Sequence, residues 1–392
     1  MKYKENKLSL GRQPVSNRFL YQKNDSAPQF PMEFYWNTKF GCMMIVSPFP
    51  VDEIRPQFSW ITCFEPEEHL DDLVENMIKV CGLTKASQIT GYSFKDDTTL
   101  KRLIARGHEN VRRIDPKADL NVKNPLASIE TLQNAFNSTN VELMIKRNKK
   151  CDLVIARHVI EHAYCLDEYL SCLGRMMTDN GYLVIEIPDC ERAMLAGDCT
   201  ILWEEHITYF NGSSFKAFLN HANYSVVFEK TYFYPLENSM VFIAQKNQQQ
   251  ENLPLANPDK DKEFFSAFCD AIGERALKIR EILENLRTRR GNIGIFGAGH
   301  LTVAFLQYNN ISDLVSVCFD DNDNKIGMFL PVGGIPIIGS EMLNVEDYPI
   351  CLLGLNPQHH KKIREVFSAY LKNGGRLISI FPETDDCIDE VK

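Results

Sequence analysis

The most constraining feature of this chain is the stretch 151–210, in which two apolar strands flank a helix-patterned segment. The first strand, 153–155, runs directly into the polar pairs Arg157-His158 and Glu161-His162. A second apolar strand, 182–187, follows one helix later, which makes a βαβ unit and implies a parallel sheet. Because open parallel sheets bind ligands at the carboxyl ends of their strands, the sequence predicts an α/β fold with a ligand crevice beside these polar residues.

Bulk composition excludes several classes of protein. At 392 residues the chain is too long for one core, so two or three domains are expected. A net charge of -9 disfavours nucleic acid as a partner, because binding phosphates requires a positive face. No run of about 18 apolar residues is present to span a membrane, and the first residues lack the apolar core of a signal peptide.

Cysteine usage favours a cytoplasmic protein. None of the 12 cysteines forms a CxxC pair, and Cys151, Cys318 and Cys351 lie inside apolar strands, where a thiol acts as a small hydrophobe. Free thiols are expected in a reducing compartment. We expect no nucleic-acid or membrane partner and a monomer or homodimer.

Composition shifts divide the chain into four segments. Residues 1–65 are irregular, aromatic and punctuated by proline, with short strand patterns such as 41–46. Residues 66–246 alternate strands and helices, and 247–288 combine a polar linker, 247–262, with a long helix over 263–286. Residues 289–392 read as a second α/β unit.

Three segments of the chain resemble one enzyme family. Residues 151–163 (CDLVIARHVIEHA) and 180–189 (NGYLVIEIPD) are similar to the second half of class I S-adenosylmethionine (SAM)-dependent methyltransferases. The segment 204–210 (EEHITYF) narrows the resemblance to the nucleotide-sugar C-methyltransferases that build branched deoxysugars. The resemblance implies a seven-stranded, Rossmann-like class I sheet, flanked by a small irregular N-terminal domain and a second Rossmann-like C-terminal domain.

The resemblance also implies SAM as cofactor and a set of cofactor contacts. Class I methyltransferases wrap SAM around the end of the first strand, where glycine lets the backbone approach, and bind its ribose through an acid after the second strand. The first loop here, 88–100 (QITGYSFKDDTTL), holds one glycine where the family has two, and it looks longer. The expected cofactor-binding residues are Gly91, Asp97, Asp115, Arg157 and His158.

Catalytic residues are expected in the EEHITYF segment. Carbon methylation requires loss of the proton next to a sugar ketone, and a neutral imidazole oriented by a carboxylate suits that step near pH 7. In the family, the histidine of the Glu-His pair is the proposed general base, which implies His206 with Glu205 beside it. Trp203 stands where the family commonly has tyrosine, and we expect it to contact the substrate.

The C-terminal unit carries further resemblance to the same family. Residues 292–306 read as strand, glycine turn and helix, and a strand ending in Asp-x-Asn, a Lys-x-Gly and a strand closing on Asn follow. In the family this domain helps to hold the nucleotide-sugar, and a glycine turn at a helix N-terminus suits a diphosphate. The expected substrate-binding residues, with Asn238 from the turn before the last strand of the middle domain, are Trp203, Asn238, Gly297, Gly299, His300, Asp320, Lys325 and Asn356.

Two further alternatives follow from the same motifs. A nicotinamide-dependent oxidoreductase could use the GxG turn, although the third glycine of a dinucleotide fingerprint is missing. A degenerate relative that has lost SAM through its altered first loop would act as a binding or scaffold protein.

No structural metal is expected in the N-terminal segment. The family has two CxxC pairs there, whereas this chain has only Cys42 and Cys63 before residue 80, too few for a tetrahedral zinc site. Aromatic side chains at 34–36 and 40 could form a small core instead.

Overall fold

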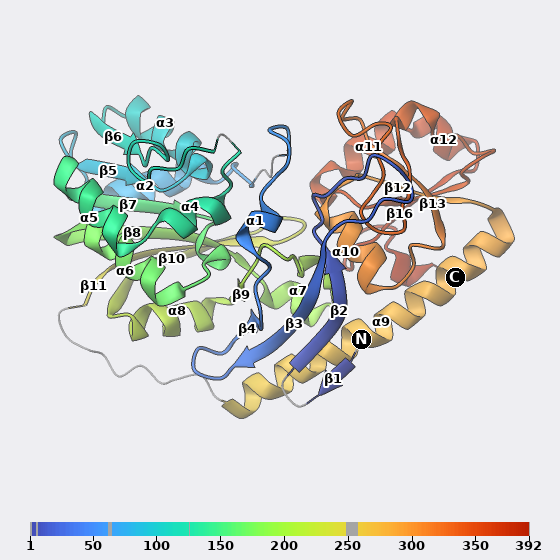
Figure 1. The fold of residues 1–392 in the computed structure, drawn as a ribbon, viewed down its shortest axis with the longest axis horizontal. Helices are drawn as coiled ribbons and strands as arrows, with labels where there is room; N and C mark the ends of the chain where they lie inside the picture. Colours follow the sequence, from blue (N-terminus) through green and yellow to red (C-terminus); the bar gives the residue numbers. More distant parts are fainter. Residues whose placement is uncertain (1, 5–6, 62–64, 125, 248–257, 392) are drawn as a thin grey trace.

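The computed structural model describes residues 2–4, 7–61, 65–124, 126–247 and 258–391. Three sheets form its framework, one for each of the N-terminal, middle and C-terminal parts of the chain. In Figure 1 the N-terminal strands lie between the middle domain on the left and the C-terminal domain on the right. Helix α9 (Pro258–Arg290), longer than the expected 263–286, runs along these strands to the C-terminal domain.

The N-terminal sheet is antiparallel and more regular than its sequence suggested. Its five strands in spatial order are β1 (Lys2–Lys4), β2 (Lys7–Pro14), β3 (Gln29–Asn37), β4 (Cys42–Ile45) and β9 (Thr208–Tyr209). Burial alternates along β3, where Met32, Phe34 and Trp36 point into the core. Trp36 stacks on Phe265 of α9 at 5.7 Å between ring centroids, so aromatic packing supports this small domain.

The last strand of that sheet comes from the middle of the chain. In β9, Thr208 and Tyr209 pair with Met44 and Met43 of β4. The EEHITYF segment is therefore joined to the N-terminal sheet by backbone pairing, which no sequence pattern predicted.

The middle domain contains the βαβ unit that its sequence predicted. The sheet order is β10 (Tyr224–Tyr232), β11 (Asn238–Lys246), β8 (Met177–Asp189), β7 (Cys151–Arg157), β5 (Gln88–Gly91) and β6 (Asn110–Arg113). β8, β7, β5 and β6 are parallel, whereas β11 and β10 are antiparallel to their neighbours.

The prediction of seven strands was wrong, since the described residues of this sheet form six. Between β6 and β7 the chain forms α4 (Ile129–Ala135) and α5 (Ser138–Arg147), after a polar stretch broken by Pro116. No apolar run there is long enough to extend the sheet beyond β6. The other helices of this domain and its borders are α1 (Val51–Ile54), α2 (Leu70–Cys81), α3 (Asp97–Ala105), α6 (Leu166–Met176), α7 (Glu191–Leu195) and α8 (Gly212–His221).

The C-terminal domain is a five-stranded parallel sheet, as expected for a Rossmann-like unit. Its order is β14 (Ile337–Ile338), β13 (Val315–Phe319), β12 (Ile293–Phe296), β15 (Ile350–Leu353) and β16 (Arg376–Ser379), with helices α10 (His300–Tyr308), α11 (His360–Val366) and α12 (Ser368–Lys372). The strand order reverses at β12, so the crevice of this sheet opens at the Gly297 turn that follows it.

Among the helices that the structure describes, none is both long and apolar enough to cross a membrane.

Candidate active site

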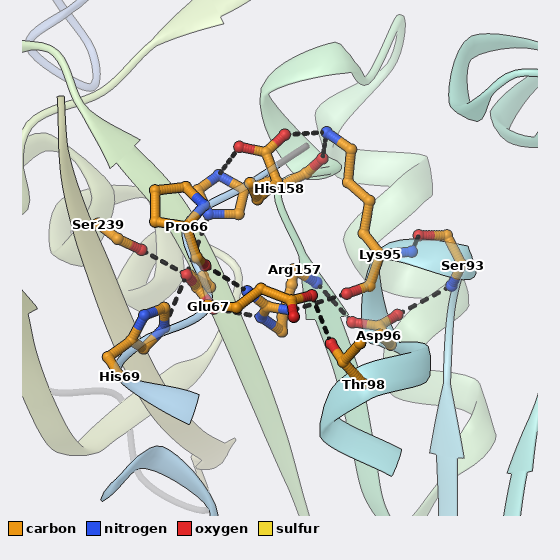
Figure 2. Close-up of polar contacts among 12 residues, drawn as sticks. Pro66, Glu67, His69, Ser93, Lys95, Asp96, Thr98, Arg157, His158 and Ser239 are labelled. Atoms are coloured by element: carbon orange, nitrogen blue, oxygen red, sulfur yellow. Dashed lines mark hydrogen bonds and ion pairs between the residues drawn. The ribbon is translucent and has the colours of Figure 1, made fainter. Parts of the chain in front are cut away.

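A buried cluster of charges lies at the carboxyl ends of β7 and β8 (Figure 2). Glu186 of β8 accepts from Arg157 Nε at 2.5 Å, His158 Nε2 at 3.0 Å and Ser239 Oγ at 2.5 Å. His69 Nε2 also lies 3.0 Å from Glu186 Oε1. Since Arg157 and Glu186 are fully buried, these contacts balance a carboxylate that has no access to water.

Arg157 and His158 were expected to contact the cofactor, and the structure uses both inside this cluster. The remaining Arg157 nitrogens donate to the backbone oxygens of Lys95 and Pro66. His158 has a φ of 48° and a buried ring between Glu186 and Glu65. Burial alone would lower the pKa of His158, but Glu65 and Glu186 raise it to about 10. The Arg157 guanidinium bonds to protein groups through all three of its nitrogens, and direct cofactor contact by Arg157 and His158 stays a prediction.

The segment before α2 is fixed across the strand ends. Lys95 Nζ lies 2.6 Å from Glu65 Oε1 and 3.0 Å from the His158 backbone oxygen. Glu67 accepts from Thr98 Oγ1 at 2.6 Å (Figure 2). Burial by itself would raise the pKa of Glu65, but the charges of Lys95 and His158 lower it to about 2. This part of the crevice is therefore preorganised by ion pairs.

Gly91 is required by close packing at the end of β5. A Cβ there would lie 2.9 Å from Asp96 Cβ and 2.9 Å from Leu100 Cδ1. Asp96, not the expected Asp97, is the buried acid of this loop, and it accepts from the backbone N–H groups of Ser93 and Arg157. Burial raises the pKa of Asp96 to about 7.

The other two expected cofactor acids are accessible. Asp97 pairs with Arg113 at 2.6 Å across the α3 start. Asp115 is exposed just after β6, where its Oδ1 accepts from the N–H groups of Lys117 and Ala118. Its Oδ2 has no hydrogen-bond partner within the described ranges, so it can accept from a ligand at the position where a ribose is expected.

The expected base, His206, lies in an aromatic group at the junction of the domains. Its ring centroid is 4.7 Å from that of His162 and 5.1 Å from that of Trp203. Trp203 in turn stacks at 4.4 Å on His300, the first residue of α10 in the C-terminal domain. Burial and then the charge of His162 lower the pKa of His206 well below its ordinary value, so His206 is neutral at pH 7.

Residues of the N-terminal segment hold the loop that carries His206. Glu204 Oε1 accepts from Ser16 N at 2.6 Å and from Ser16 Oγ at 2.7 Å, and Trp203 Nε1 donates to Ser16 Oγ at 3.2 Å. The Tyr209 hydroxyl bonds the backbone N–H and oxygen of Trp203. The loop is thus fixed from both sides.

The expected partner of His206, Glu205, lies in a different group of side chains. Its Oε1 accepts from Asn17 Nδ2 at 3.3 Å, and Glu130, His162 and Glu205 each place a ligand-type atom within 4.8 Å of the others. Burial raises the pKa of Glu205 well above its ordinary value, and the charges of Glu130 and Glu204 add to this. The carboxylate grouped with the His206 ring is Glu161.

Two sets of potential metal ligands occur among the described residues, Glu161 with His162 and His206, and Glu130 with His162 and Glu205. By their spacing, the ligand atoms of each set could hold a metal ion. In the N-terminal segment Cys42 is buried in β4, and Cys63 lies outside the described residues.

Side chains of the C-terminal domain hold its glycine turn in place. Gly297 has a φ of 101°, which requires glycine. Asp320 Oδ2 accepts from Ala298 N at 2.8 Å and from Lys325 Nζ at 3.1 Å, and Lys325 also donates to the Ala298 oxygen. Asp320 and Lys325 thus hold the turn in place, and the expectation that they bind substrate stays a prediction. A nicotinamide cofactor would need the carboxylate of Asp320 for its ribose. Because that carboxylate is already bonded within the turn, the structure disfavours the nicotinamide alternative.

The other substrate-binding expectations have mixed outcomes. A Cβ at Gly299 would meet no atom within 4 Å, so the turn is open beside His300. Asn356 caps the short helix that follows β15 by accepting from Gln358 N. Asn238 is the buried first residue of β11, and its Oδ1 has no hydrogen-bond partner in the described structure. Gly299 and His300 are partly exposed, as are Trp203, Gly297, Lys325 and Asn356.

Comparison with known proteins defines the class. Residues 97–229 match the family model described as a methyltransferase domain, and 247–382 match the model described as the C-methyltransferase C-terminal domain. The chain is therefore a SAM-dependent methyltransferase. Its C-terminal part is similar to the C-terminal domain of C-methyltransferases, and this match follows the methyltransferase match along the chain.

The chain is also similar to individual proteins. The C-methyltransferase NovU from Streptomyces niveus is 21% identical over 392 residues, with 96% of this chain and 92% of that protein covered. The redox-sensing repressor Rex from Bacillus velezensis is 37% identical over 67 residues, 16% of this chain and 30% of that protein. A SAM-dependent methyltransferase from Clostridium acetobutylicum covers 47% of this chain and 93% of its own, with 9% identity and a TM-score of 0.32.

The residues present fit SAM at one point. Asp115 is exposed after β6, and its Oδ2 can accept from the ribose hydroxyls. The space beside Gly91 is filled by Asp96 and Leu100, so that glycine serves packing within the loop.

Sequence reasoning missed Glu130, Glu186 and Asp96. A glutamate within the apolar run of β8 was a usable signal for Glu186, because a charge in a buried strand needs partners. Glu130 stands in a segment without a motif, and only the fold brings it to His162.

Proposed function

We propose that the protein methylates a carbon of a nucleotide-activated keto-deoxysugar, with His206 as the general base. The observation that supports this most is the neutral imidazole of His206, partly exposed between the middle and C-terminal domains. A base must be deprotonated before it can act, and the lowered pKa keeps His206 in that form at pH 7. A positioned imidazole contributes ~100 to 10,000-fold to such a step.

The chemistry is a proton transfer followed by carbon alkylation. His206 takes the proton from the carbon beside the ketone, and the electrons of that C–H bond form the enolate. Held at Asp115, SAM would supply the electrophilic methyl group to the enolate carbon, with the SAM sulfur as the leaving group. The methyl acceptor must therefore present its ketone toward His206.

The C-terminal domain is proposed to hold the nucleotide part. The open turn at Gly299 precedes α10, whose first N–H groups carry partial positive charge suited to a diphosphate. Because His300 of this helix stacks on Trp203, a ligand bound at the turn would lie next to the His206 loop.

The test uses purified protein, SAM with a labelled methyl group, and a thymidine-diphosphate 4-keto-deoxysugar. We expect one methyl group on a carbon adjacent to the ketone, detected by mass spectrometry and NMR. His206→Gln should abolish turnover while SAM binding persists, and His221→Gln, an exposed histidine at the end of α8, serves as control. Near-normal turnover in His206→Gln would contradict the assignment of the base.

A further inference from the structure

Helix α10 connects the glycine turn of the C-terminal domain to the loop that carries His206. The helix begins at His300, directly after Gly299, and ends at Tyr308. Tyr308 is buried, and its hydroxyl donates to the Leu202 backbone oxygen at 2.8 Å. The end of α10 is therefore bonded to the segment that leads into the His206 loop. In Figure 1 α10 lies on the side of the C-terminal domain next to the N-terminal strands.

The beginning of α10 contacts the same loop through two stacked rings. The centroids of the His300 and Trp203 rings are 4.4 Å apart, and their planes differ by 19°. Trp203 is also fixed by the N-terminal and middle parts of the chain. Its Nε1 donates to Ser16 Oγ at 3.2 Å, and the Tyr209 hydroxyl bonds its backbone N–H and oxygen. The stack is thus a direct contact between a fixed loop and the first residue of α10.

Trp203 in turn contacts the proposed base. The backbone N–H of His206 donates to the Trp203 oxygen at 3.0 Å, and the centroids of the two rings are 5.1 Å apart. A change in the position of the indole therefore changes the contacts of the imidazole. His300, Trp203 and His206 form a continuous series of ring contacts from the glycine turn to the proposed base.

His300 is available to a ligand bound at the turn. It is partly exposed, and its ring nitrogens make no hydrogen bond to the residues that the structure describes. A Cβ at the neighbouring Gly299 would meet no atom within 4 Å, so there is open space beside it. Because an imidazole carries an N–H donor and the oxygens of a diphosphate are acceptors, a diphosphate at the turn can bond to His300 directly.

We propose that His300 and Trp203 are positioning residues that link the nucleotide to the proton transfer. A diphosphate at the glycine turn contacts His300, and the His300–Trp203 stack then holds the His206 imidazole against the carbon that loses its proton. This inference rests on the proposed function and gives the nucleotide a task beyond binding. Binding energy from a part of the substrate that does not react can orient the reacting groups, so a truncated substrate loses kcat as well as affinity.

The fluorescence of Trp203 tests the link without any turnover. The chain has three tryptophans, so Trp36→Phe with Trp60→Phe leaves Trp203 as the only tryptophan that emits. We expect thymidine diphosphate, at a concentration that calorimetry shows to be saturating, to change the emission of Trp203. The change should disappear when His300→Leu is added.

Each other result of this titration identifies which idea fails. Saturation without an emission change, or the same change in the His300→Leu protein, would overturn the link and leave the proposed function intact. Absence of thymidine diphosphate binding to the wild type would overturn both the link and the nucleotide part of the proposed function.

The kinetic test compares the thymidine-diphosphate 4-keto-deoxysugar with the same sugar carrying only a 1-phosphate. For the wild type we expect kcat to be more than tenfold higher with the nucleotide-sugar. In His300→Leu and in Trp203→Leu this ratio should fall to within threefold of one. Trp203→Phe, which keeps a ring for stacking, and the control His221→Gln should retain the ratio. A merely structural role would lower kcat for both substrates equally, and an unchanged ratio or a wild-type ratio near one would overturn the proposal.

Combining His300→Leu with Trp203→Leu provides a second check. If the two side chains act through one contact, the double variant loses no more kcat than the more affected single variant. Losses that multiply would mean independent roles and would overturn the proposal. Urea unfolding followed by circular dichroism establishes that each variant is folded, and if Trp203→Leu does not fold, the substrate ratio of His300→Leu decides alone.

Discussion

Glu186 offers a quantitative test of the buried charge cluster, through the substitution Glu186→Gln. Glutamine keeps the volume but removes the charge that balances Arg157 at 2.5 Å and His158 at 3.0 Å. Removing one partner of a fully buried pair leaves an uncompensated charge and costs ~3 to 5 kcal/mol. We therefore expect the free energy of unfolding to fall by about this amount, since Arg157 is 1% exposed and has no route to water.

Urea unfolding at pH 7.5 measures the effect, with circular dichroism and tryptophan fluorescence recorded together to check for a single transition. The matched control is Glu229→Gln, which breaks the exposed pair with Lys216 at 2.9 Å and should cost less than ~1 kcal/mol. If Glu186→Gln costs no more than the control, the cluster is not a balanced set of charges and the reasoning fails.

Four further predictions concern pH, the cofactor and metal content. The free energy of unfolding should fall as pH rises from ~6.5 toward 10. The folded pKa of His158 is raised to about 10, so the stabilising contribution of its charge is lost over that range. A free energy of unfolding that increases with pH over this range would contradict the prediction. Gly91→Ala should cost ~1 to 3 kcal/mol and weaken SAM in calorimetric titration, since its Cβ would lie 2.9 Å from Asp96 and Leu100, and unchanged stability would show that α3 can shift. Asp115→Lys should weaken SAM by the ~1.5 to 3 kcal/mol of a charged hydrogen bond, and equal affinity would place the ribose elsewhere. Elemental analysis should find no zinc after dialysis, and one zinc per chain would identify missed ligands.

The α/β architecture could be predicted because buried parallel strands appear as continuous apolar runs. Strands β5, β7, β8 and β12 lie where those runs placed them, within a few residues. The N-terminal sheet could not be predicted in the same way, because its fifth strand, β9, is two residues long and comes from a segment far along the chain. Pairing between distant segments has no local signature in sequence.

Residues of the candidate site could be predicted where a sequence motif marks them, and less well where their role depends on contacts with other residues. His206 stood out by its motif, and the structure places it at a domain junction. The roles of Asp320, Lys325 and Arg157 depend on hydrogen bonds across loops, which a sequence does not show. Glu130 is a similar case, because only its contact with His162 in the folded structure marks it as a residue of the candidate site.

Because β9 pairs with β4, the boundary between the first two domains exists in the sequence but does not separate them in the structure. Ser16 holds Glu204, and Met43 and Met44 hold the strand that follows the His206 loop. A chain cut after residue 65 to isolate a smaller unit would lose the Ser16 contact with the His206 loop and leave β9 without a neighbour. The N-terminal sheet would in turn lose its last strand. For protein engineering, these two parts are a single module that must be transferred, truncated or fused as one.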